Sequence, residues 1–124
     1  MKFAVSDLAF AGFKNSVLEH LPAEYGIEIF YEFGTDDYWD ARCEKILADR
    51  NAGLSIHAPC VAVNLADPKD FNYLEVYRRT LAYAQRQKAA FVVLHTNEQW
   101  FGDRYNVTML VEKRLKEILA VAKM

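Results

Sequence analysis

Short apolar runs alternate with longer, helix-patterned segments along the whole sequence, and this alternation constrains the fold more than any other feature. The runs read as strands because they are short, apolar and bounded by glycine, proline or polar residues. Strands that alternate with helices pair in parallel and are joined by right-handed crossovers. We therefore expect an α/β fold of four βα units in a single domain, 1–124. The expected strands are residues 3–6, 27–33, 54–57 and 91–95.

Each segment between or after these strands carries apolar residues at helical spacing. Such a stripe predicts a helix with one face buried against the sheet. Thr35, Asp70 and Asn106 are the expected N-caps of the second, third and fourth helices. The expected buried stripes, in order, are Phe13, Val17, Leu18 and Leu21; Trp39, Cys43, Ile46 and Leu47; Leu74, Tyr77, Leu81 and Ala84; Val111, Leu115, Ile118, Leu119 and Ala122.

Two architectures accept four βα units: half of a (βα)8 TIM barrel, or a small open sheet with helices on both faces. Residues alternate between the two faces of a strand, so Ser55 and His57 lie opposite the apolar side. A sheet covered on both faces has nearly continuous apolar strands. The polar residues here, including Glu28 and Glu32, suit a barrel interior and favour the half-barrel. We expect Glu28 to pair with Lys2 in the barrel floor.

Two expected strands end in a histidine, His57 and His95, and these are the leading candidate site residues. The carboxyl ends of parallel strands lie at one rim, where α/β folds bind their ligands. Two imidazoles there could bind a small-molecule substrate or begin a site for a divalent metal such as Zn, Mn, Mg or Co. The alternative is that each histidine only bonds a neighbouring group.

Other residues near the same rim could contact a ligand. Glu32 could bind a substrate or a metal, or be an exposed acid at a strand end. Cys60, at His-x-x-Cys spacing from His57, could add a thiolate. Asn64 and Asn97 could bond substrate hydroxyls or stabilise turns. Trp100 could cover a substrate ring, fill the space between a helix and a strand, or seal an interface.

Composition excludes several classes of function. A net charge of −2 over 124 residues argues against a nucleic-acid-binding protein. No apolar run reaches the roughly 18 residues that span a membrane, so we expect no membrane partner. No glycine-rich phosphate loop follows a strand, which argues against a nucleotide cofactor. The two cysteines form no paired motif, as expected for free thiols in the cytoplasm.

Ser55-Ile56-His57-Ala58-Pro59, with Asn64-Leu65-Ala66 and Val92-Val93-Leu94-His95, resembles the xylose isomerase-like TIM barrel superfamily. That group contains sugar phosphate isomerases and epimerases, inosose-processing enzymes and endonuclease IV. Gly26-Ile27-Glu28-Ile29 also matches its second strand, so the resemblance covers the whole chain in order. It implies proton transfer next to a carbonyl, with a divalent metal bound largely by residues of later strands.

Those later strands are not in this sequence, so the resemblance implies an N-terminal half-barrel that lacks the main base and is inactive alone. We expect its partner to be a second copy, as a homodimer, or a C-terminal half-barrel. The first alternative is a noncatalytic assembly unit or weak metal-binding unit. The second is an endonuclease IV-like repair nuclease, whose histidines matching His57 and His95 bind metal. His95-Thr96-Asn97 differs from the His-Pro-Gly of that branch.

Overall fold

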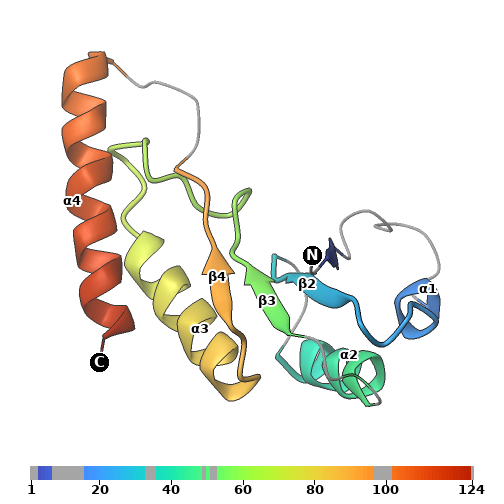
Figure 1. Ribbon diagram of the computed structural model, residues 1–124. Helices are drawn as coiled ribbons and strands as arrows, with labels where there is room; N and C mark the ends of the chain where they lie inside the picture. The colour runs from blue at the N-terminus through green and yellow to red at the C-terminus, as the bar shows by residue number, and fades with distance from the viewer. Residues whose placement is uncertain are drawn as a thin grey trace.

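Strands and helices alternate strictly in the computed structural model, which describes residues 3–6, 16–32, 36–48, 50, 53–96 and 102–123 (Figure 1). The expected order of elements is therefore confirmed. The elements are β1 (Ala4–Ser6), α1 (Ser16–Glu19), β2 (Gly26–Phe30), α2 (Asp36–Leu47), β3 (Leu54–His57), α3 (Tyr73–Arg86), β4 (Phe91–Val93) and α4 (Arg104–Ala122).

The four strands form one all-parallel sheet in the order β1-β2-β3-β4. In register, Ile27 pairs with Leu54, and Ile56 with Val92. Consecutive order in a parallel sheet requires crossovers of one hand, which place the helices on the same face. This α/β architecture is the expected one and is consistent with half of a βα repeat fold such as a (βα)8 barrel.

The main core lies between one face of the sheet and helices α2 and α3. Ile27, Ile29 and Ile56 are fully buried in it. Their neighbours on the sheet lie on the opposite face, as the two-residue period of a strand requires. The alternation predicted from the sequence is thus confirmed. The helical residues in this core are Trp39, Cys43 and Ile46 of α2 and Tyr83 and Ala84 of α3.

A second core joins α3, α4 and the β3–α3 loop, which we define as residues 58–72. Ala58, Val63 and Leu65 of the loop are buried against Tyr77 of α3 and Ile118 of α4. The two helices lie side by side in Figure 1, at the yellow-to-red end of the chain. The loop is therefore packed as part of the fold.

The last helix differs from expectation at both ends. α4 begins at Arg104, and the side chain of Asp103 accepts from the amide of Asn106, so Asn106 is not the cap. Near the other end Leu119 is 58% exposed and Ala122 is also exposed. Among the helices and strands, α4 packs mainly on α3, and it also packs against the β3–α3 loop. Its buried stripe is therefore narrower than the apolar pattern suggested.

The predicted cap of the third helix is also wrong. α3 begins at Tyr73, and its N-cap Asn72 makes no side-chain capping bond. Asp70 instead accepts from the amides of Asn64 and Asn72. The carboxylate thus stabilises the loop before the helix. The buried stripe of α3 is confirmed in part: Tyr77 and Ala84 are buried, whereas Leu74 and Leu81 are only half-buried.

Some expectations concern residues outside the described ranges. These are the Lys2–Glu28 pair, the Thr35 cap and most of the first helix, of which residues 16–19 are described. The strands β2 and β4 end earlier than expected, at Phe30 and Val93. Among the described residues, each helix is too short or too polar to cross a bilayer.

Candidate ligand site at the carboxyl end of the sheet

The imidazoles of His57 and His95 meet at the carboxyl end of the sheet. Their Nε2 atoms are 2.9 Å apart, and the ring centroids are 4.8 Å apart. His57 is the last residue of β3, and His95 follows β4 by two residues. Because β3 and β4 are parallel neighbours, both side chains reach the same rim. The structure therefore brings together His57 and His95, the two leading candidate site residues of the sequence analysis.

The hydrogen bonds of His57 define which nitrogen carries its proton. Nδ1 lies 2.9 Å from the carbonyl oxygen of Ala58, which can only accept, so Nδ1 carries a hydrogen. In neutral His57 the Nε2 atom is then an acceptor, and the Nε2–H of His95 donates to it. The single lone pair of His57 Nε2 is therefore directed at His95, and it becomes available to a ligand only when that bond opens.

His57 is 8% exposed, whereas His95 is exposed. The ring of Phe30, on the neighbouring strand, contacts His57 edge-on with centroids 4.7 Å apart. The backbone amide of Tyr31 also donates to the carbonyl of His57 at 2.9 Å. One imidazole is thus held rigidly by the sheet, while its partner faces solvent.

Glu32 lies after the end of β2 and binds the β3–α3 loop. Its Oε2 accepts from the amide of Cys60 at 2.6 Å, and its Oε1 accepts from those of Val61 and Ala62 at 3.0 and 2.7 Å. Successive backbone N–H groups that converge on one anion form a nest. Glu32 therefore occupies an anion site of its own protein, and these bonds occupy much of its acceptor capacity.

Cys60 adjoins this nest but is poorly suited to bind a metal as a thiolate. Burial, and then the negative charge of Glu32, raise the pKa of the Cys60 thiol. The protonated thiol is thereby favoured at neutral pH. Both Cys43 and Cys60 are free cysteines.

Asn64 stabilises a turn within the loop, which was one of its two expected roles. Its Oδ1 accepts from the amide of Ala66 at 2.9 Å, and its own amide donates to Asp70 at 2.7 Å. The other candidates at the rim, Asn97 and Trp100, lie outside the described residues.

Arg114 was not identified from the sequence, although it orders the same loop. It lies on α4, is 4% exposed, and donates to backbone carbonyls of the β3–α3 loop. An arginine on an amphipathic helix normally lies on the solvent-exposed face. Arg114, however, falls within the apolar stripe formed by Val107, Val111 and Ile118, and this position was the sequence signal that could have indicated a buried arginine.

The two imidazoles are compatible with a divalent metal, provided that they separate slightly and that His95 carries its hydrogen on Nδ1 when the metal binds. Two nitrogens on one tetrahedral zinc lie roughly 3.3 Å apart at ordinary bond lengths, compared with the 2.9 Å found here. The Nδ1 bond of His57 to a backbone carbonyl is the usual orientation of a metal-binding histidine. Within the described ranges, no three His, Cys, Asp or Glu side chains form a ligand set, so further ligands would be water or other groups.

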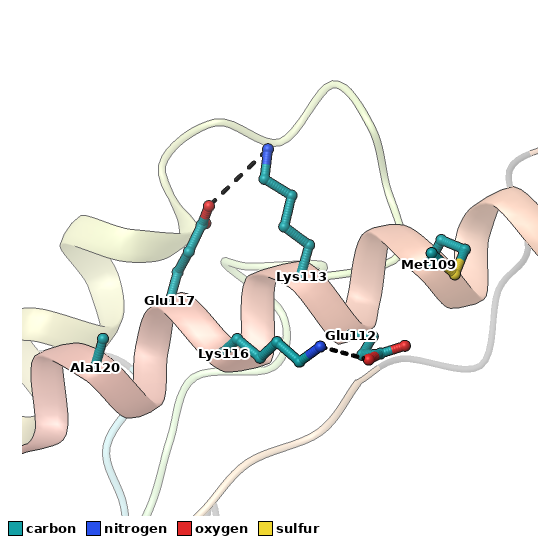
Figure 2. A pocket seen from close by; sticks show the side chains of 6 residues that line it. All are labelled: Met109, Glu112, Lys113, Lys116, Glu117 and Ala120. Atoms are coloured by element: carbon teal, nitrogen blue, oxygen red, sulfur yellow. Dashed lines mark hydrogen bonds and ion pairs between the residues drawn. The ribbon is translucent and has the colours of Figure 1, made fainter.

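A surface hollow of about 390 Å³ lies elsewhere, along α4 (Figure 2). Its lining comes from that helix alone: Met109, Glu112, Lys113, Lys116, Glu117 and Ala120. Two ion pairs at helical spacing cross it, Lys116 with Glu112 at 2.6 Å and Lys113 with Glu117 at 4.0 Å. Because these side chains largely satisfy one another in solvent, the hollow is a weaker candidate than the histidine pair.

The chain matches no protein-family model, no curated protein and no solved structure in the comparisons made with each.

Proposed function

We propose that this chain is the N-terminal portion of a cytoplasmic sugar or sugar phosphate isomerase or epimerase. The observation that carries the proposal is the contact between His57 and His95 at the carboxyl end of a parallel sheet. Ligands of α/β barrels bind at that end. The His-Ala-Pro and Asn-Leu-Ala motifs that resemble such enzymes lie at the same place in the chain.

In this proposal the two histidines bind and orient the ligand, and neither is the main base. With Nδ1–H fixed on Ala58, the Nε2 lone pair of His57 can accept from a sugar hydroxyl or bind a divalent ion once the ligand displaces the His95 N–H that bonds it in the free protein. A bound divalent ion would polarise the substrate carbonyl. The base that moves the proton belongs to the half of the barrel beyond this sequence.

Zinc titration tests the binding step with the metal alone. We expect His57→Gln and His95→Gln each to abolish zinc binding measured by calorimetry, because a single imidazole leaves a weak site. His20→Gln is the matched control, since His20 is an exposed residue after α1. Zinc binding that survives both substitutions would refute the role of the pair.

An activity screen tests the reaction class. The chain is assayed with divalent metals on a panel of ketoses and inososes, beside a version extended by whatever coding sequence follows. Turnover by the extended form alone supports the proposal. Cleavage of DNA at abasic sites by that form would instead support the endonuclease IV-like alternative.

A second candidate is a noncatalytic half-barrel that assembles with another half and binds metal weakly. It is favoured by the two edge strands β1 and β4, each paired on one side within the described sheet. Phe91 on β4 is 59% exposed. Zinc binding without turnover in any form of the protein would favour this candidate.

A further inference from the structure

One charged side chain of α4, Arg114, forms hydrogen bonds to the β3–α3 loop. Arg114 extends its guanidinium into the loop, where both terminal nitrogens donate to backbone carbonyls. The acceptors are the carbonyls of Asn64 at 3.4 Å, Leu65 at 3.1 Å and Asp67 at 2.7 Å from Nη1, and of Asp70 at 2.6 Å from Nη2.

This arginine is a buried cation with neutral hydrogen-bond partners. Its guanidinium carbon also lies 4.5 Å from the centroid of the Tyr73 ring, a cation–π contact. Within the described part of the chain Arg114 makes no ion pair. A buried charge is costly unless it is hydrogen-bonded, so only the loop conformation that presents these carbonyls accommodates it.

The same loop contacts both His57 and Glu32. At its start, the carbonyl of Ala58 accepts from His57 Nδ1, and the amide of Ala58 donates to Val93 at 2.8 Å. The next residues supply the N–H groups that bind Glu32. Any shift of the loop would move the acceptor of His57 and open the nest together.

We propose that Arg114 is a positioning residue: it fixes the β3–α3 loop so that Glu32 stays in its nest and His57 keeps its orientation. Arg114 acts at a distance, through the loop. The part of this inference that concerns metal affinity rests on the proposed function, while the part that concerns the nest does not.

The chain offers a matched control in Arg50. Arg50 likewise donates to several backbone carbonyls, but around the amino end of β2. Its acceptors are the carbonyls of Leu18, Leu21, Pro22, Tyr25 and Ile46. Arg114→Met and Arg50→Met therefore remove comparable sets of bonds at opposite ends of the sheet.

Amide hydrogen exchange of the intact chain is the test. In Arg114→Met we expect the amides of Cys60, Val61 and Ala62 to exchange about tenfold faster or more, relative to those of Ile29 and Ile56. In Arg50→Met we expect the exchange rates of these three amides, relative to those of Ile29 and Ile56, to stay at their wild-type values. Equal acceleration in both variants would overturn the proposal, because it would indicate only lower global stability.

Two further measurements complete the test. If Arg114→Met does not fold, Arg114→Lys replaces it; we expect a smaller but local acceleration, and a wild-type exchange pattern would overturn the proposal. Zinc affinity should fall about tenfold or more in the Arg114 variant and stay unchanged in Arg50→Met. If the wild-type chain binds no zinc, the proposed metal site fails, whereas the exchange data still decide the role of Arg114.

Discussion

The carbonyl oxygen of Gly53 lies 2.9 Å from the position that a Cβ atom on Gly26 would occupy. The Cβ of Ala4 would lie 3.3 Å from the same position. The amide of Ile27 donates to that carbonyl at 3.1 Å, and the amide of Gly26 donates to Phe3 at 2.8 Å. These bonds tie β2 to the segments at Phe3 and Gly53, so neither segment can move away from a Cβ atom on residue 26 without losing a hydrogen bond.

Gly26→Ala should therefore lower the free energy of unfolding by about 2 kcal/mol, the usual cost of overpacking. Gly53→Ala is the control, since nothing lies within 4 Å of a Cβ placed there. It should change stability by less than about 0.5 kcal/mol. Urea unfolding measures both, and equal losses would contradict this account of β2.

Tyr31→Phe should destabilise the protein by about 1 kcal/mol at pH 7. The hydroxyl of Tyr31 donates to Asp36 at the start of α2, and this bond is the main cause of the lowered pKa of Asp36. Ionised Asp36 thus stabilises the fold at pH values above its ordinary pKa of 3.8. This stabilisation is lost as the pH falls through the lowered pKa that Asp36 has in the folded protein. The difference between the two proteins should shrink below about pH 4; a pH-independent difference would exclude this linkage.

Tyr77→Phe should leave stability at pH 7 unchanged or raise it by about 1 kcal/mol. The Tyr77 hydroxyl is buried and has no hydrogen-bond partner in the described structure, so its removal relieves an unsatisfied group. Thr80→Val is the contrasting variant and should lower stability, because the Thr80 hydroxyl that it removes donates to Val76 at 2.8 Å. A clear loss of stability in Tyr77→Phe would show that the hydroxyl has a partner.

The same tyrosine should make the protein sensitive to alkali. Burial, and then the charges of Cys60 and Glu32, raise the pKa of Tyr77 to about 12. Stability is therefore unaffected by this group at pH values below its ordinary pKa of 10.0, and it falls as the pH rises from there through about 12, because the unfolded chain ionises first. Urea unfolding at pH 9, 10 and 11 should show a smaller decline in Tyr77→Phe than in wild type, and identical declines would refute the assignment.

Glu32→Gln should cost about 2 kcal/mol, because three amides lose a charged acceptor. The loss should appear chiefly as faster exchange of those amides. Glu24→Gln, at an exposed turn position, should have little effect. Unchanged exchange at Cys60 in Glu32→Gln would show that the loop holds its conformation without the carboxylate.

Two copies of the chain should associate through the edges β1 and β4. Unpaired strand edges promote association, and two half-barrels with consecutive parallel strands can close around a two-fold axis. Sedimentation at about 10 μM should give twice the 14.3 kDa chain mass. Phe91→Lys should yield a monomer, whereas Ala41→Lys on α2 should not; a monomeric wild type contradicts the association.

Much of the fold could be predicted because its signals are local. The two-residue period of β2 and β3 assigned Ile29 and Ile56 to the core, and both are fully buried. Helical spacing did the same for Trp39 and Tyr77. The pattern failed at Leu119, since apolar spacing cannot reveal how many neighbours a helix has.

The candidate site was predictable only in part. The histidine pair follows from two strand ends in a parallel sheet, which is a rule of topology. The contacts of Glu32 link residues 28–30 positions apart and those of Arg114 link residues 44–50 positions apart, and both involve backbone groups. Backbone donors and acceptors carry no sequence signature, so such contacts cannot be read from residue types.

Arg114 also has a consequence for the order of folding. Its bonds to the loop close chain segments of more than 40 residues, whereas the strand pairs of the sheet are nearer in sequence. Long closures are entropically costly and form late. During synthesis, the sheet can assemble while the β3–α3 loop is still open, and the rim acquires its final shape only after the last helix has emerged from the ribosome.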